Sequence, residues 1–130
     1  MIDQNGAIFP GKLFKTAKDG VCELTDYVNG AVGVANNISL IAAVTGKRIL
    51  VVSGFAYSNG AFTQLTFKSA SGGTNKRTIA VPANTVATPN VNICPNGIFD
   101  GFETNTGEGL FVDNTAVIAL VSLRYLTYTP

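Results

Sequence analysis

The chain has 130 residues, with 9 lysines and arginines against 8 aspartates and glutamates, so its net charge is about +1. Charged residues make up 13% of the sequence, roughly half the usual share, and 46% of the residues are hydrophobic. This composition excludes intrinsic disorder and excludes nucleic-acid binding through a basic excess. Because histidine is absent, the usual general base and the commonest metal ligand are missing, and we expect no catalysis, no metal and no cofactor.

The first segment, residues 1–36, differs from the rest of the chain. Its apolar residues are interrupted by Pro10-Gly11 and are too few to form a core of their own. The segment is either a strand added to the main domain or an arm that reaches a neighbouring protein. In the second case we predict that the arm docks through Ile8, Phe9, Leu13 and Phe14.

No stretch of the sequence predicts export or membrane insertion. Residues 1–6 lack a basic stretch followed by an apolar one, so we expect no secretory signal. We expect the protein to be made in the cytoplasm. The most apolar stretch, Ile38–Tyr57, is interrupted by Lys47 and Arg48, and Ala116–Leu123 is far shorter than the roughly 20 residues that span a bilayer. We therefore expect no membrane partner.

Residue pairs that favour tight turns recur along the chain and indicate short strands between them. They are Asn5-Gly6, Asp19-Gly20, Asn29-Gly30, Asn59-Gly60, Gly72-Gly73, Asn96-Gly97 and Asp100-Gly101. The clearest predicted hairpin joins Arg48–Tyr57 to Phe62–Ser69, the second of which reads as an edge strand. Gly54, inside the first strand, indicates a bulge or a close backbone approach.

The last strand, Ala116–Tyr128, is apolar on both faces and almost uncharged. Exposed on either face it would promote aggregation, so we expect it to be covered twice, by its own core and by a second layer or subunit. The residues assigned to that subunit interface or second-layer contact are Val117, Val121, Leu123 and Tyr125. Strand Ile49–Tyr57 is apolar on both faces too.

Further strands are predicted at Asn37–Val44, Thr78–Val81, Val91–Cys94, Ile98–Phe102 and Gly109–Val112. The fold class is therefore all-β: an antiparallel two-sheet sandwich, best described as a jelly roll, over residues 37–130, with an extended N-terminal arm or added strand over 1–36. Cys22 and Cys94 are either two buried thiols or a single bridge.

Three features with chemical potential have simpler structural explanations. The acidic residues Asp100, Glu103, Glu108 and Asp113 fit solvated turns better than a calcium or glycosidase site. Basic residues beside turns, such as Lys76-Arg77, are solvated or contact an anionic surface. The tyrosines Tyr57, Tyr125 and Tyr128 belong to a core or interface, or else form a platform for sugars.

From Asn37 onward the chain resembles small β-sandwich proteins of tailed-phage virions. The resemblance rests on Ile41–Ile49 before an apolar strand and on Phe102-Glu103-Thr104 followed by Gly107-Glu108-Gly109-Leu110 before the last strand. It implies a head decoration, or cement, protein on the outer capsid surface that stabilises contacts between major capsid subunits. It also implies self-association as a homotrimer or a dimer. The alternative is a tail- or fibre-associated module for host recognition or carbohydrate binding.

Overall fold

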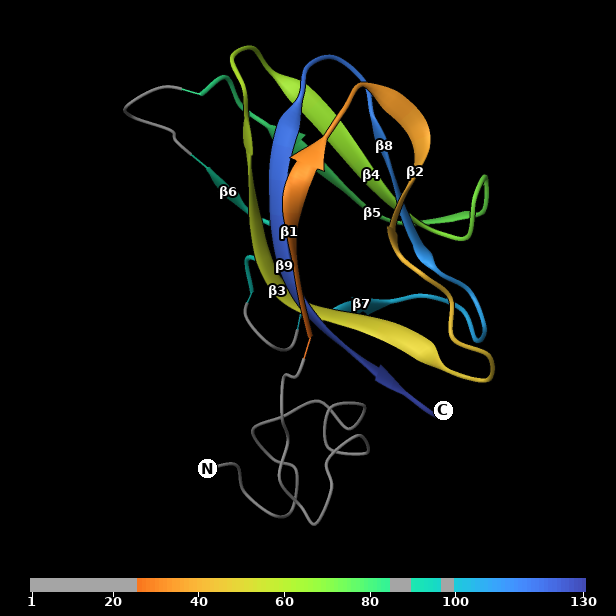
Figure 1. Ribbon diagram of the computed structural model, residues 1–130. Coiled ribbons are helices and arrows are strands. Elements are labelled where there is room, and N and C mark those ends of the chain that lie inside the picture. Colours follow the sequence, from red (N-terminus) through yellow and green to blue (C-terminus); the bar gives the residue numbers. More distant parts are fainter. Residues whose placement is uncertain (1–25, 85–89, 97–99) are drawn as a thin grey trace.

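The computed structural model describes residues 26–84, 90–96 and 100–130, which form two antiparallel sheets packed face to face (Figure 1). The described strands are β1 (Asp26–Val32), β2 (Ala35–Ile41), β3 (Arg48–Ser58), β4 (Thr63–Ser69), β5 (Thr74–Val81), β6 (Val91–Asn92), β7 (Phe102–Glu103), β8 (Leu110–Asn114) and β9 (Ala119–Tyr128). The predicted all-β sandwich is confirmed. Within the described ranges, no helix is long and apolar enough to cross a membrane.

The strands pair in a nested order. One sheet runs β1-β9-β3-β6, with β7 also pairing to β3, and the other runs β2-β8-β4-β5. The first strand therefore pairs with the last, the second with the next to last, and β4 with its neighbour β5. A long antiparallel ribbon folded over on itself in this way gives the strand order of a jelly roll.

The predicted hairpin between Arg48–Tyr57 and Phe62–Ser69 is wrong. The two stretches are strands β3 and β4, but β3 pairs with β9, β6 and β7, whereas β4 pairs with β5 and β8 in the other sheet. The connection at Asn59-Gly60 therefore crosses from one sheet to the other. For the same reason β4 is an inner strand of its sheet and not the edge strand that its sequence indicated.

Strand β1 lies inside the segment 1–36 that the sequence set apart. It pairs with β9 over seven residues, from Asp26 opposite Tyr125 to Val32 opposite Ala119, and Val32 is buried in the core. Asn29-Gly30 lies within this strand and does not form the turn that was predicted there. Residues 26–36 are thus part of the sandwich, and residues 1–25 lie outside the described residues.

The main core fills the space between the sheets. Phe67, Leu65 and Leu110 contribute from the four-stranded sheet, and Ile49, Val51 and Leu123 contribute from the five-stranded sheet. A second, smaller cluster of buried residues (Leu50, Val52, Leu126 and Tyr128) belongs to the same strands β3 and β9. Because Leu50 lies opposite Leu126 while Val51 lies opposite Tyr125, the two clusters use opposite faces of these strands.

Gly54 shows both features that its position in a strand indicated. The β3–β9 register shifts between Val51 and Ser53, which marks a bulge just before the glycine. A Cβ atom on Gly54 would lie 2.5 Å from the Ser122 carbonyl oxygen and 3.0 Å from the Leu123 Cα atom. The two strands therefore approach so closely that only a glycine fits.

Candidate docking surface

Three connections meet at one end of the sandwich, at the top of Figure 1: the β1–β2 turn, the β3–β4 crossing and the β8–β9 loop. The Asn59 N–H donates to the Ile118 carbonyl oxygen at 2.8 Å, which joins the β3–β4 crossing to the β8–β9 loop. We call this end of the molecule the loop end. Its three connections are held together by further polar contacts in the interior.

A buried pair, Thr63 and Asn114, fixes the loop end from inside. Both residues are at most 1% exposed, and the Thr63 hydroxyl donates to the Asn114 Oδ1 atom at 2.6 Å. The Asn114 Nδ2 atom donates to the Val32 carbonyl at 3.0 Å and to the Val117 carbonyl at 2.8 Å. The Thr63 oxygen also accepts the Ala116 N–H. One amide group therefore connects β8 with the ends of β1 and of the β8–β9 loop.

The tips of these connections carry exposed apolar side chains. Val34 is 52% exposed in the β1–β2 turn, Phe62 is 56% exposed in the β3–β4 crossing, and Ile118 is 46% exposed in the β8–β9 loop. The other large apolar side chains that are exposed among the described residues are Val44 and Phe55. A rigid end that presents three apolar side chains to solvent is suited to docking on another protein, because the side chains need little further ordering on binding.

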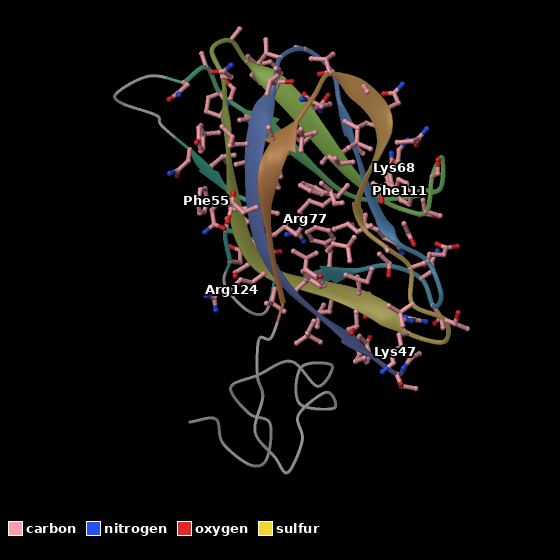
Figure 2. The ribbon with its side chains drawn as sticks, viewed as in Figure 1. Lys47, Phe55, Lys68, Arg77, Phe111 and Arg124 are labelled. Atoms are coloured by element: carbon pink, nitrogen blue, oxygen red, sulfur yellow. The ribbon has the colours of Figure 1, made fainter. Side chains whose placement is uncertain are left out.

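The opposite end of the sandwich is more polar. The β2–β3 connection there carries Val44 and Lys47, and Figure 2 shows Lys47 close to the end of β9. Gly107 donates its N–H to the Lys47 carbonyl at 2.8 Å, so this connection is tied to the loop between β7 and β8. Val44, 41% exposed, is the exposed large apolar side chain of this connection and provides a control for the loop end.

The predicted interface residues of the last strand occupy different environments. Val121 and Leu123 are at most 1% exposed and belong to the main core, so the layer that covers them is the four-stranded sheet of the same chain. Tyr125 is half-buried and packs against that core. Val117 is half-buried in the loop end, where its carbonyl accepts the Asn114 amide. The predicted arm contacts, Ile8, Phe9, Leu13 and Phe14, lie outside the described residues.

The acidic residues form separate contacts and do not gather into one site. Asp100 pairs with Arg77 at 3.1 Å, Glu103 with Arg48 at 3.1 Å, and Asp113 with Lys68 at 2.6 Å. Glu108 accepts hydrogen bonds from the Ser69 hydroxyl and the Asn105 amide. In the described part of the chain, no group of three or more potential ligands could hold a metal ion.

Two of these ion pairs join neighbouring strands of one sheet, β3 with β7 and β4 with β8, whereas Arg77–Asp100 joins β5 to the segment just before β7 in the other sheet. Burial alone would raise the pKa of the Asp113 carboxyl, but hydrogen bonds from Lys68 and the Asn37 N–H, together with the charge of Lys68, hold this pKa below its usual value. Arg77 lies between the sheets in Figure 2, where its guanidinium sits 4.9 Å from the centre of the Phe102 ring and donates to the Ile93 carbonyl. The acidic and basic residues that the structure describes in these pairs are therefore structural.

Two other candidate features of the sequence also have structural roles. Cys94 is a free, buried cysteine, and burial raises the pKa of its thiol to about 11, so it is protonated and unreactive near neutral pH. Cys22 lies outside the described residues. Tyr125 faces the core, whereas Tyr57 of β3 and Tyr128 of β9 lie on the opposite face. They are at opposite ends of the β3–β9 pair, where Tyr57 lies opposite Leu120 and Tyr128 lies opposite Arg48. The three tyrosines therefore do not form a common platform.

The loop end was not predicted from the sequence. The sequence feature that could have indicated it is an apolar residue in each of the three connections. These residues are Val34 after Gly33, Phe62 after Asn59-Gly60-Ala61, and Ile118 after Ala116-Val117. Comparison with models of protein families and with curated proteins gave no match to this chain.

Proposed function

We propose that this protein is a structural protein of a virion, a decoration protein that docks on the outer surface of a phage head and stabilises contacts between major capsid subunits. The observation that carries this proposal is the loop end, where Val34, Phe62 and Ile118 are exposed on connections fixed by the Thr63–Asn114 pair. The sequence resemblance to phage virion proteins supplies the partner. The protein would then reside on the capsid surface after synthesis in the host cytoplasm.

The energetics of the loop end favour binding to a lattice through several copies. Burying three side chains that are about half exposed contributes roughly 1 kcal/mol each, or about 3 kcal/mol per chain. This corresponds to an affinity weaker than millimolar, which is too weak for a stable complex of a single chain. A homotrimer, or a dimer, engages two or three loop ends at once, and the effective concentration of the linked sites makes the total binding tight.

The N-terminal arm is the second contact in this proposal. Its apolar residues Ile8, Phe9, Leu13 and Phe14 would dock on a neighbouring capsid subunit and add to the affinity of the loop end. Because β1 begins at Asp26, a protein that lacks residues 1–18 keeps every described strand and is expected to fold. Such a protein should bind empty heads more weakly than the full chain does, and unchanged binding would remove the arm from the proposal.

We expect the triple substitution Val34→Ser, Phe62→Ser and Ile118→Ser to weaken binding to empty phage heads at least about 100-fold. This factor is the loss of about 3 kcal/mol per chain, about 1 kcal/mol for each of the three side chains, expressed as a change in affinity. The measurement is co-sedimentation of the purified protein with heads that lack it. The heads come from the phage whose genome encodes the chain.

The control is Val44→Ser, which removes one exposed apolar side chain at the opposite end; Val44 is 41% exposed, and the three loop-end side chains are 46–56% exposed. Its binding should equal that of the unchanged protein. Thermal unfolding should show that both variants are folded, since exposed substitutions usually change stability by about 0.5 kcal/mol or less. Binding by the triple variant at full strength, or an equal loss with Val44→Ser, would contradict the assignment of the loop end.

A further inference from the structure

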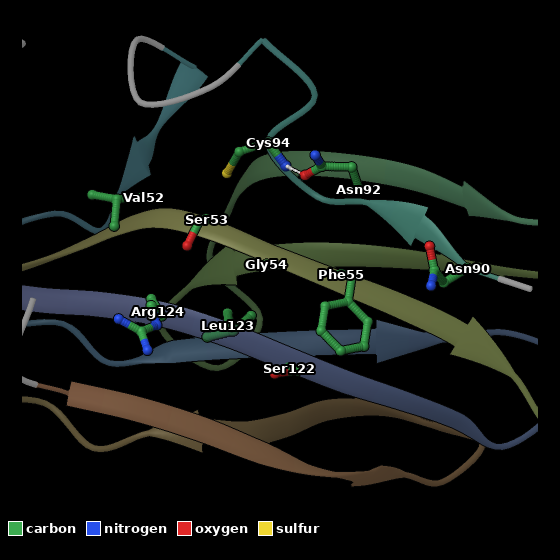
Figure 3. A pocket seen from close by; sticks show the side chains of 10 residues that line it. All are labelled: Val52, Ser53, Gly54, Phe55, Asn90, Asn92, Cys94, Ser122, Leu123 and Arg124. Atoms are coloured by element: carbon green, nitrogen blue, oxygen red, sulfur yellow. Dashed lines mark hydrogen bonds between the residues drawn. The ribbon is translucent and has the colours of Figure 1, made fainter.

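A hollow of about 560 Å³ lies on the outer face of the five-stranded sheet, away from the loop end (Figure 3). Pockets for small ligands typically have volumes of about 300–1,000 Å³. Strands β3 and β9 form its floor, and residues of β6 and its flanks form one side. The polar and aromatic side chains that matter for the argument are Ser53, Phe55, Asn90, Asn92, Ser122 and Arg124.

Strand register explains why these side chains share one face. Phe55 lies opposite Ser122 on β9 and opposite Asn92 on β6, so one row across three strands carries a hydroxyl, an aromatic ring and an amide. The next row on the same face pairs Ser53 with Arg124. Residues directly opposite each other in antiparallel strands project from the same face of a sheet. The arrangement is therefore set by the backbone and requires no rearrangement of loops.

The close approach at Gly54 places the two rows near each other. Its missing side chain lets β9 pack against β3 at the Ser122 carbonyl, between the rows that contain Phe55 and Ser53. On the other side, the Gly54 carbonyl accepts the Ile93 N–H at 2.9 Å, which anchors the segment after β6 to β3. The Asn92 side-chain oxygen accepts the Cys94 N–H at 3.0 Å, as Figure 3 shows, and this fixes the Asn92 amide at the wall.

The chemistry of the hollow suits a sugar better than other small ligands. Phe55 is 42% exposed, and its ring offers an apolar face on which the C–H groups of a pyranose can stack. Amides and a guanidinium provide paired hydrogen-bonding groups that match neighbouring hydroxyls. Among the described residues of the lining Arg124 is the one cation, which is too little positive charge for a phosphate-rich ligand. Cys94 borders the hollow as a buried, protonated thiol, so it supplies no thiolate there.

We propose that this hollow binds one pyranose unit of a polysaccharide, with Phe55 stacked on the ring and Asn90, Asn92 and Arg124 bonded to its hydroxyls. The site is on the side of the sandwich, so it stays accessible when the loop end is docked on another protein. It adds a glycan-binding activity to the proposed structural role and does not depend on that role. It also differs from the tyrosine platform considered from the sequence, because its aromatic residue is Phe55.

The test is binding of the full-length protein to an array of bacterial mono- and oligosaccharides, followed by NMR titration with the best disaccharide. Because a single hexose has few atoms with which to contact the protein, we expect a Kd of the order of 1 mM. Saturable shifts should appear at the backbone amides of Ser53, Phe55 and Asn92. Backbone amides at the loop end, such as that of Ile118, should not shift.

Two exposed phenylalanines make matched variants for this titration. Phe55→Ala should weaken sugar binding at least about 10-fold, whereas Phe62→Ala, which removes the 56% exposed ring of the loop end, should leave it unchanged. Binding to phage heads should be weakened by Phe62→Ala and left unchanged by Phe55→Ala. Failure of one proposal is therefore distinguishable from failure of the other. A flat array, equal sugar binding by Phe55→Ala and the unchanged protein, or equal loss with Phe62→Ala would each overturn the sugar site.

Discussion

Replacing Gly54 by alanine should lower the free energy of unfolding by at least about 3 kcal/mol. The new Cβ atom would lie 2.5 Å from the Ser122 carbonyl oxygen, a distance that real Cβ atoms do not adopt. Relief requires β3 and β9 to separate, and these are the two central strands of the five-stranded sheet. A domain with a total stability of roughly 5–15 kcal/mol would lose a large part of it.

Gly30→Ala is the matched control for this substitution. Gly30 lies in β1, on the other side of β9, and a Cβ atom there would meet nothing within 4 Å. Alanine at this position should leave stability unchanged or raise it slightly, because glycine weakens a strand interior by roughly 0.5–1 kcal/mol. Chemical denaturation of both variants measures the difference. Equal stability of Gly54→Ala and the unchanged protein would show that the two strands are not in close contact.

Replacing Asn114 by alanine should lower the free energy of unfolding by about 3 kcal/mol and also weaken docking through the loop end. The substitution removes the acceptor of the Thr63 hydroxyl and the donor to the Val32 and Val117 carbonyls, all in the buried end of the sandwich. Each buried polar group left without a partner costs roughly 1–3 kcal/mol. The loops that carry Val34 and Ile118 would then lose their common anchor.

The neighbouring substitution Thr115→Ala provides the control for this prediction. The Thr115 hydroxyl accepts the Gln64 N–H at 3.3 Å in an exposed position, so its loss should change stability by less than about 1 kcal/mol. Hydrogen exchange then separates the two effects. Faster exchange of the Asn59 and Ala116 amides in Asn114→Ala, but not in Thr115→Ala, is the expected result. Identical exchange in both variants would contradict the anchoring role of Asn114.

The regular part of the fold was predictable because its signals are local. Continuous apolar runs located β3 and β9, and because these runs are apolar on both faces they indicated that each strand has buried residues on two faces. Gly54 marked both the bulge and the close approach, since no other residue type fits there. The turn residues Gly72-Gly73 correctly separated β4 from β5. Among the described strands, these are the one pair of sequence neighbours that are joined by a turn and hydrogen-bonded to each other.

Strand pairing could not be predicted because it depends on contacts between distant residues. A tight connection such as Asn59-Gly60 looks the same in sequence whether the next strand returns in the same sheet or crosses to the other one. Strand β1 was misread because Asn29-Gly30 favours a turn, yet pairing with the strongly apolar β9 holds it extended. The hydrogen bonds between β1 and β9 outweigh the local preference of Asn29-Gly30 for a turn.

The candidate sites escaped prediction for the same reason. Val34, Phe62 and Ile118 are far apart in sequence, and each alone is an ordinary surface residue. They belong to one end because Thr63 and Asn114, which are 51 residues apart, bond to each other in the interior. Likewise, Phe55 and Asn92 became neighbours through the β3–β6 pairing, which no sequence pattern indicated.

The orientation of the protein on a decorated phage head tests the central claim most directly. Cryo-electron microscopy of heads saturated with the full-length protein would show which end of the sandwich faces the shell. We predict that the loop end, with Val34, Phe62 and Ile118, contacts the capsid surface and that the β2–β3 connection with Val44 points away from it. A reconstruction in which the Val44 end faces the shell would contradict the account. So would heads that carry no density for the protein after incubation with an excess of it.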